Sequence, residues 1–228
     1  MKVFDCVQYS EEWWLLRQAL PTASNFDRII TAVTGKPSSA QLAYACELAA
    51  ELTFLGPNFF TERQDRPKSL AMQVGTDTEP EARRYYEMLM EAEVEHVGFC
   101  LSDCGRYGCS PDGLVKKDGV RVGALELKCP ELKTHAGYLL SGDPSVPAEY
   151  RPQVHGHLVV TGLPWCDFLS YAPPLDPFRV RVVPNGYTTK LKQCIEDFCG
   201  EYDEVVKKLG LEEKRAEVNR NRIRNLPA

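Results

Sequence analysis

Residues 110–130 read SPDGLVKKDGVRVGALELKCP, two apolar runs separated by the polar sequence KKDG. Apolar runs on either side of an Asp-Gly pair predict a β-hairpin. The second run is unusual because Glu126 and Lys128 interrupt its apolar residues. Side chains two residues apart on a strand point to the same face, so these two project together. Leu125 and Leu127 then face apolar packing on the other side.

Asp112 stands at the start of the first predicted strand or in a turn beside it. If the two runs pair, Asp112 and Glu126 meet at one end of the sheet with Lys128 next to them. Close carboxylates repel each other unless a cation lies between them, and hard oxygen ligands select Mg²⁺ or Mn²⁺. A neighbouring lysine can orient an attacking water or stabilise negative charge on a phosphate. The pattern favours phosphodiester hydrolysis. The alternative is an ordinary Pro-Asp-Gly turn beside an unrelated surface Glu and Lys.

Apolar periodicity assigns most of the remaining chain to helices and strands. The predicted helices are two short segments within residues 9–33, then residues 38–55, 70–93, 131–142, 147–162 and 186–210, with one more following. The predicted strands are residues 93–102, 107–115, 120–128, 165–173 and 178–184, and residues 56–69 are a predicted loop. This order predicts one mixed α/β domain over residues 1–228, with a mostly antiparallel sheet flanked by helices.

Prolines and small polar residues mark several helix boundaries. Pro21 separates the two short helices, and Ser24 is the predicted N-cap of the second. Pro80 either bends the helix of residues 70–93 or marks a fresh start. Pro152 is tolerable only in the first turn of its helix.

The bulk composition indicates a soluble globular protein, with 43% hydrophobic and 26% charged residues among 228. No run of about 18 apolar residues and no signal peptide is apparent, so we expect no membrane association and a cytoplasmic location. The net charge of −5 argues mildly against nucleic acid as a partner. Residues 207–224 nevertheless carry seven Lys or Arg against three Glu, and the favoured interpretation of that run is a solvated helix face.

Nine cysteines are scattered along the chain, an odd number that favours reduced thiols, many of them in the core. Cys100, Cys104 and Cys109 form the only cluster. Their spacing lacks a fourth nearby ligand and matches no usual zinc pattern.

The full strings SPDG and LELKCP resemble the core of the phage lambda-type exonuclease family, the YqaJ-like viral recombinases of the PD-(D/E)xK nuclease superfamily. Further matches follow in the order of the family, over about residues 12 to 160. They are Trp13, Arg17 and Thr22-Ala23-Ser24; Gly75, Glu79, Ala82 and Arg83; and Tyr150 with Gln153. The resemblance implies a restriction-endonuclease-like fold, with a catalytic core at about residues 75–160.

The resemblance also implies roles for several of these residues. Asp112 and Glu126 would be the metal-binding carboxylates, with the Leu127 carbonyl as a further ligand. Lys128 would position or activate the water, Glu79 would be a further active-site acid, and Gln153 would hold the water or Lys128. The residues implied to grip the 5′-phosphate of a DNA end are Arg17, Ser24 and Ser110.

The resemblance further implies a ring-shaped homotrimer that threads duplex DNA and digests one strand 5′ to 3′ with Mg²⁺. For this chain we expect two Mg²⁺ ions, for which Mn²⁺ can substitute. We also expect double-stranded DNA ends as substrate, a single-strand annealing recombinase as partner, and a phage or prophage origin in a bacterial host cell. The chain departs from the family pattern at Trp14 and Pro21, and its C-terminal third matches weakly.

Two alternatives stay open. The first is another nuclease of the superfamily, a restriction-type endonuclease or a helicase-associated nuclease with an iron–sulfur cluster, although the spacing of Cys166, Cys194 and Cys199 does not fit such a cluster. The second is a catalytically silent DNA-end-binding protein of the same fold. Trp13 and Trp14 are expected in the core. His155 and His157 are two residues apart on a predicted helix and face different directions, so both are expected to be structural.

Overall fold

The computed structural model of the chain describes residues 1–54 and 70–224, and the loop predicted for residues 56–69 lies outside these ranges. The helices are α1 (Glu11–Arg17), α2 (Gln41–Glu51), α4 (Leu70–Met90), α5 (Leu132–Leu140), α6 (Arg151–Thr161), α7 (Gly186–Lys208) and α8 (Glu212–Arg224), with 3-10 turns η1 (Ala23–Arg28) and η2 (Ala148–Tyr150). The strands are β1 (Lys2–Phe4), β2 (Glu93–Glu95), β3 (Phe99–Leu101), β4 (Gly108–Cys109), β5 (Gly113–Lys117), β6 (Val120–Lys128), β7 (Cys166–Ser170) and β8 (Phe178–Val182).

The strands form two sheets. The larger sheet has the order β2-β5-β6-β7-β8, and the smaller has the order β1-β3-β4. Strands β6 and β7 run parallel, whereas the other neighbours in the larger sheet run antiparallel. The predicted mixed α/β fold with a mostly antiparallel sheet is therefore confirmed.

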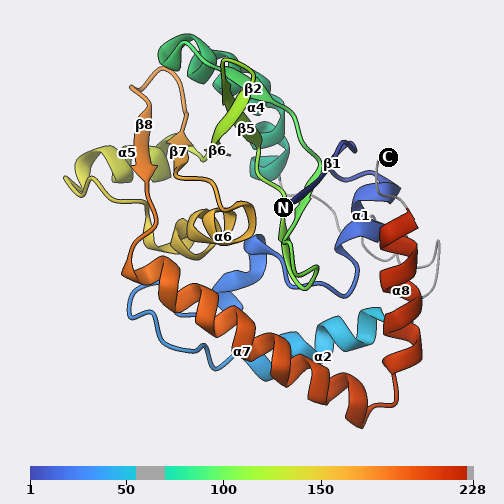
Figure 1. Ribbon diagram of the computed structural model, residues 1–228. Coiled ribbons are helices and arrows are strands. Elements are labelled where there is room, and N and C mark those ends of the chain that lie inside the picture. The colour runs from blue at the N-terminus through green and yellow to red at the C-terminus, as the bar shows by residue number, and fades with distance from the viewer. Residues whose placement is uncertain (55–69, 225–228) are drawn as a thin grey trace.

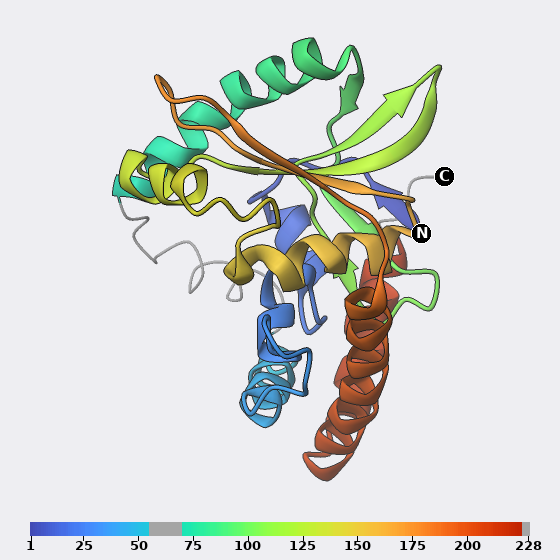
Figure 2. The ribbon, with the colours of Figure 1, turned by 90° about the vertical axis from the view of Figure 1, so that its left-hand side faces the viewer.

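Helices cover both faces of the larger sheet (Figures 1 and 2). Helix α4 packs on one face against β6, and α6 packs on the other face against β6 and β7. On the far side of α6 lie η1 and α7, and α2 packs against α7. The apolar core follows these layers, because Leu125 and Leu127 pack in the cluster under α4 while Ala124 belongs to the cluster around α6. The alternation predicted for β6 is thus confirmed.

The predicted hairpin of residues 110–130 is formed by β5 and β6. Their register runs from Gly113 opposite Leu125 to Lys117 opposite Val120. The connecting residues Asp118 and Gly119 have φ angles of 52° and 77°, the left-handed pair that an Asp-Gly turn between antiparallel strands requires. The amide of Asp112 donates to the carbonyl of Leu125 at 3.0 Å, so Asp112 extends the pairing and lies beside Glu126.

Two predicted strands are each divided between the sheets. Residues 107–115 contain β4, which pairs with β3 in the smaller sheet, and β5, which belongs to the larger one. Residues 110–112 separate them, and Pro111 cannot donate the amide hydrogen bond that a continuous strand needs. Residues 93–102 divide in the same way into β2 and β3. Because the chain passes from the smaller sheet to the larger one between β4 and β5, Ser110 and Asp112 lie at the junction of the two sheets.

The helix boundaries mostly agree with the predictions. Pro80 lies inside a continuous α4, and Pro152 occupies the first turn of α6. The predicted helix of residues 38–55 is shorter, because α2 covers Gln41–Glu51. The prediction that Ser24 is an N-cap is wrong. The cap position of η1 belongs to Thr22, two residues earlier, and Ser24 lies within the 3-10 helix.

The C-terminal helix α8 is anchored to α1 by a buried arginine. Arg222 is only 3% exposed, and its Nε donates to the carbonyl of Leu16 at 2.8 Å. Its second contact is with the carbonyl of Gln18. A cation at the last carbonyls of a helix satisfies acceptors that the helix leaves unpaired. The expectation that this basic run forms only a solvated face is therefore wrong for Arg222. Among the described residues, no helix is both long and apolar enough to span a membrane.

Candidate active site

Glu126 lies at the centre of a buried hydrogen-bonded cluster. Its side chain is 1% exposed. The Oε1 atom accepts from Lys128 Nζ at 2.5 Å and from Gln153 Nε2 at 2.6 Å. The Oε2 atom lies 2.6 Å from His157 Nε2. Lys128 comes from the same strand, whereas Gln153 and His157 come from α6, which covers this face of the sheet.

The neighbours of Glu126 determine its ionisation. Burial alone would raise the pKa of the Glu126 carboxyl, but the Lys128 charge and the hydrogen bonds from His157 and Lys128 together lower it. Burial alone would likewise lower the pKa of the Lys128 ammonium, and the Glu126 and Asp112 carboxylates together raise it. The two side chains therefore stay charged near neutral pH, and they hold each other in one orientation.

Asp112 meets this cluster from the start of β5. Its Oδ2 accepts from the Leu127 amide at 2.6 Å, which ties the carboxylate to β6. Arg83 of α4 donates to the Asp112 main-chain carbonyl. Together these contacts fix both the backbone and the carboxylate of Asp112 at the end of the hairpin.

The pKa of Asp112 is raised from its ordinary range to about 8. Burial is the largest cause, and the Glu126 and Glu79 carboxylates add to it, while Lys128 and the Leu127 amide oppose it. A divalent cation beside Asp112 would favour the charged carboxylate. Glu126 and Glu79 place negative charge beside the buried Asp112 carboxyl, and a bound cation would offset that charge. The residues present therefore fit the predicted metal site.

The geometry limits how a cation would be held. In the described part of the chain, no group of three or more His, Cys, Asp or Glu side chains could hold a metal ion by itself. An ion at Asp112 and Glu126 would therefore need oxygens from the backbone or from water, which Mg²⁺ commonly retains. The Leu127 carbonyl remains the predicted backbone ligand.

The three clustered cysteines lie in the smaller sheet and its connection. Cys100 and Cys109 are opposite each other on β3 and β4 as buried thiols, and Cys104 is exposed.

Helix α6 presents different residues on different faces. Gln153 and His157 are four residues apart, so they lie on one face, and both contact Glu126. His155 lies on another face, where its Nδ1 is 2.8 Å from the Thr188 hydroxyl of α7. The structural role expected for His155 agrees with this contact, whereas His157, for which the same role is expected, contacts the candidate active-site acid Glu126. The four-residue spacing from Gln153 is the sequence signal that identifies His157.

A second polar cluster surrounds Arg17 at the end of α1. Arg17 Nη1 donates to the Ser110 hydroxyl at 3.2 Å, and Nη2 donates to Thr22 at 3.0 Å and to Ser24 at 2.9 Å. Trp13 is 5% exposed, and its Nε1 donates to the Ser110 hydroxyl at 2.8 Å. The structure thus brings together Arg17, Ser24 and Ser110, the three predicted phosphate-binding residues. Thr22, which matches the family pattern but has no predicted role, joins them through its hydrogen bond with Arg17.

The two clusters are connected through the backbone and through α6. Ser110 precedes Asp112 by two residues, so one short segment carries members of both. A Cβ atom at Gly156 of α6 would lie 2.6 Å from Phe26 of η1. This glycine therefore lets the helix that carries Gln153 approach the segment that carries Ser24.

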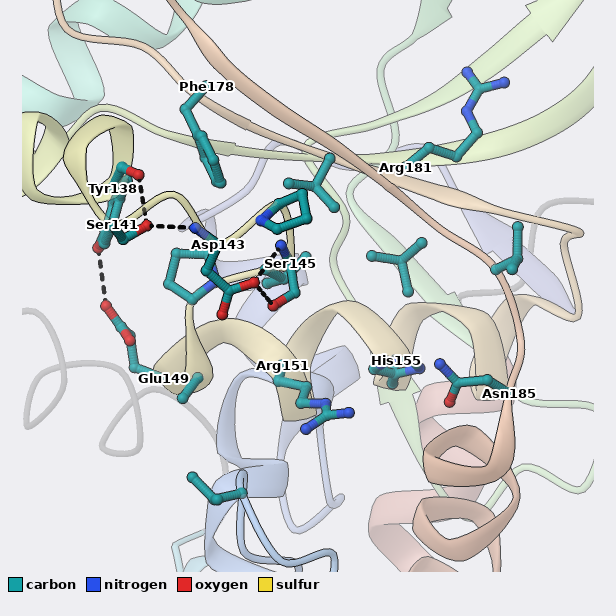
Figure 3. Close-up of a pocket in the computed structure, with 18 residues that line it drawn as sticks. Tyr138, Ser141, Asp143, Ser145, Glu149, Arg151, His155, Phe178, Arg181 and Asn185 are labelled. Atoms are coloured by element: carbon teal, nitrogen blue, oxygen red, sulfur yellow. Dashed lines mark hydrogen bonds between the residues drawn. The ribbon is translucent and has the colours of Figure 1, made fainter.

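A pocket of about 710 Å³ lies away from both clusters (Figure 3). It is bordered by the loop before α6, by β8 and by the start of α7, with Arg151 and His155 of α6 on one wall. Ser141, Asp143 and Ser145 are hydrogen-bonded to the loop itself, as the dashed lines show. None of the predicted site residues borders this pocket.

Comparisons with known proteins agree with this arrangement. A family model described as the YqaJ-like viral recombinase domain matches residues 12–164. Among solved structures, the chain is similar to an alkaline exonuclease, LHK-Exo, from Laribacter hongkongensis, with 27% identity and a TM-score of 0.70 over 92% of this chain and 100% of that one. The complex of LHK-Exo with dAMP gives 28% identity and a TM-score of 0.66 over 88% and 98%.

A phage-related exonuclease from Haemophilus somnus 129PT is 14% identical, with a TM-score of 0.59 over 83% of this chain and 96% of that one, and it supports the fold alone. No curated protein sequence matches the chain. The fold is that of the restriction-endonuclease-like exonucleases, and the similarity to LHK-Exo over almost the whole chain implies a nuclease. Since the family model spans more than half of the sequence, the chain belongs to the YqaJ-like viral recombinase family.

Proposed function

We propose that this protein is a Mg²⁺-dependent exonuclease that degrades one strand of linear double-stranded DNA in the 5′ to 3′ direction. It starts at 5′-phosphorylated ends and leaves 3′ single-stranded tails for phage-type recombination. The observation that carries the proposal is the position of Asp112, Glu126 and Lys128 around one buried site, with the Arg17 cluster connected to it through Ser110.

Asp112 and Glu126 hold the cations, two Mg²⁺ ions with Mn²⁺ as a substitute, and the Leu127 carbonyl and Glu79 assist. When bound, these ions stabilise the charge that develops on the scissile phosphate and activate water. Lys128, held by Glu126 at 2.5 Å, orients the attacking water and supplies positive charge. Gln153 fixes the same Glu126 oxygen, so Glu126 and Lys128 keep one geometry.

Arg17 binds the 5′-phosphate, and Ser24 and Ser110 donate to the phosphate oxygens. An arginine presents a planar fork of donors that suits a terminal phosphate. Arg17 already bridges Ser110 and Ser24 in the structure, so its position is fixed before a phosphate arrives. This arrangement favours strand ends that carry a 5′-phosphate.

The proposal includes the oligomeric state of the protein, its recombination partner and its cellular location. Residues 1–228 form one nuclease domain, three copies close into a ring around duplex DNA, and a single-strand annealing recombinase receives the 3′ tail. The resemblance to lambda-type exonucleases supports these statements. It also supports a location in the cytoplasm of a bacterial host cell. A net charge of −5 is compatible with threading if the basic residues line the bore.

Two other functions compete with this one. An endonuclease of the same fold would cut closed circular DNA, whereas the Arg17 cluster favours a strand end. A catalytically silent end-binding protein would not need Lys128 and Gln153 on the same Glu126 oxygen. The test is a linear duplex with a 5′-phosphate on one strand only, incubated with and without Mg²⁺. We expect Mg²⁺-dependent loss of the phosphorylated strand, and cleavage of closed circles or loss from the 3′ end would contradict the proposal.

A further inference from the structure

Tyr9 occupies a backbone conformation that normally favours glycine. Its φ is 67°, and its side chain is 53% exposed. A non-glycine residue in this region costs about 1 kcal/mol or more and persists where its surroundings hold it. Here the residues on both sides of Tyr9 are held in place.

The preceding residue, Gln8, is bound to the segment that leads into Asp112. Its Nε2 donates to the carbonyl of Pro111 at 3.1 Å and to that of Val97 at 3.3 Å. The following residue, Ser10, is the N-cap of α1, and its hydroxyl accepts from the Trp13 amide at 3.3 Å. The chain between these two anchors has little freedom, so the position of Tyr9 is determined by the active-site scaffold.

The Tyr9 ring packs beside the cluster around Arg17. Its centroid is 5.0 Å from that of Trp13, with the planes tilted by 44°. Trp13 in turn carries the Arg17 guanidinium 4.2 Å from its ring centroid. On the other side, the Glu79 and Asp112 carboxylates raise the pKa of the Tyr9 hydroxyl, after the larger effect of burial, while Lys128 and Arg17 oppose them. The neighbouring Gln8 is bonded to the carbonyl of Pro111, which directly precedes Asp112, so Tyr9 is also tied to the segment that carries this carboxylate.

The proposed function places a 5′-phosphate at Arg17 and the next phosphate of the strand at Asp112 and Glu126. The nucleoside between these two phosphates is then expected near Tyr9, whose ring contacts Trp13 beside Arg17 and whose neighbour Gln8 is bonded to Pro111. An exposed aromatic ring is a stacking surface for any nucleobase, because every base has a π face. Stacking there offsets the free energy lost when the terminal base leaves the duplex.

We propose that Tyr9 is the nucleobase subsite for the 5′-terminal nucleotide, stacking its ring on that base while Arg17 holds the phosphate. The inference rests on the proposed function. Because any base can stack, the subsite contributes affinity for the terminal nucleotide without selecting a sequence.

The test compares two linear duplexes that differ only in the 5′-phosphorylated terminal residue, thymidine in one and a tetrahydrofuran abasic residue in the other. Release of the first residue is measured with Mg²⁺, and end binding is measured by fluorescence anisotropy with Ca²⁺ in place of Mg²⁺. The wild-type protein is expected to prefer the thymidine end by about 5- to 100-fold, the range that base–aromatic stacking provides. The preference should appear in KM and in end binding more than in kcat.

The variants separate stacking from folding. Tyr9→Phe keeps the ring and should keep the preference. Tyr9→Gly removes the ring at a position whose φ suits glycine, so its Tm should stay close to that of the wild type while the two ends become equivalent. Asp118→Gly is the matched control, since Asp118 also has a positive φ but lies at the tip of the hairpin. It should leave the preference unchanged.

The proposal is overturned if the wild-type protein treats the two ends alike, or if a folded Tyr9→Gly variant keeps the preference. Failure of the proposed function looks different. In that case no 5′ residue is released from either duplex, and the anisotropy comparison still decides whether Tyr9 binds a base. A protein that digests both duplexes at equal rates keeps the proposed function and loses the subsite.

Discussion

His157 Nε2 lies 2.6 Å from Oε2 of Glu126, and both side chains are 1% exposed. The contact leaves His157 Nδ1 buried, and it is the one such side-chain atom without a hydrogen-bond partner in the described part of the chain. His157 therefore acts on Glu126 as a positioning residue and has no other polar contact to maintain.

We expect His157→Leu to lower the cleavage rate by about 10- to 100-fold, as removal of an outer contact to a metal ligand commonly does. His157→Gln keeps an N–H donor and should recover most of the rate. The Kd for Mn²⁺, measured by electron paramagnetic resonance, should follow the same order. Equal rates and equal Mn²⁺ affinities for the leucine and glutamine variants would show that His157 only fills space.

Lys128→Ala removes the ammonium that Glu126 holds at 2.5 Å. We expect cleavage to fall by about 100-fold or more, since a single donor at developing charge commonly contributes that much. Binding of DNA ends should stay within a few-fold of the wild type. Lys116→Ala is the control, because Lys116 pairs with the exposed Glu93 on β2 at 3.0 Å. Persistent cleavage by a folded Lys128→Ala variant would refute the role given to Lys128.

Arg17→Ala should remove the preference for 5′-phosphorylated ends over 5′-hydroxyl ends. We expect a loss of about 10- to 100-fold in kcat/KM on the phosphorylated end, the range for hydrogen bonds to a charged group. Rates on the hydroxyl end should change little. Arg121→Ala serves as control, since Arg121 of β6 pairs with Glu95 of β2 at 2.6 Å. A wild-type protein with no preference between the two ends would rule out the phosphate site.

The stability of the metal-free protein should depend on pH through Asp112. Its pKa is about 8 in the folded protein, against about 4 in an unfolded chain. The folded state therefore holds the proton more tightly, and the contribution of Asp112 to stability is lost as the pH rises from about 4 to about 8. In EDTA, Asp112→Asn should match the wild type at pH 5 and exceed its Tm by at least about 2 °C at pH 8.5.

The control for this comparison is Asp118→Asn at the exposed turn, which should show no gap that grows with pH. Added Mg²⁺ should raise the Tm of the wild type at pH 8.5 and leave that of Asp112→Asn unchanged. A variant less stable than the wild type at both pH values would contradict the raised pKa.

Much of the fold could be predicted from local patterns. The alternation along β6 fixes which side chains face α4 and which face α6. The Asp-Gly turn fixes the pairing next to it, but a register shift between Val115 and Lys116, which the sequence does not signal, sets the pairing at the active-site end of the hairpin. The sequence gives no comparable signal for the smaller sheet, in which Lys2 lies opposite Leu101. Pairing between residues so far apart in the sequence depends on how the whole chain folds. In addition, a strand of three residues is too short to show a recognisable alternation of apolar and polar residues.

The candidate site was predictable where its residues share a short motif or a family pattern. Asp112, Glu126 and Lys128 lie within one hairpin, and Arg17 and Ser24 were found through the resemblance. His157 and Tyr9 were missed for different reasons. The contact of His157 depends on how α6 packs against β6, and the role of Tyr9 depends on a backbone angle that the residue type does not favour.

The central claim is that Asp112 and Glu126 together bind a divalent cation beside Lys128. The most direct test is a Mn²⁺ titration of the DNA-free protein, followed by electron paramagnetic resonance. We expect the wild type to bind Mn²⁺, and Asp112→Asn and Glu126→Gln each to bind it at least about 10-fold more weakly, because each substitution removes a ligand charge. Wild-type affinity in both folded variants, or no Mn²⁺ binding by the wild type, would contradict the account.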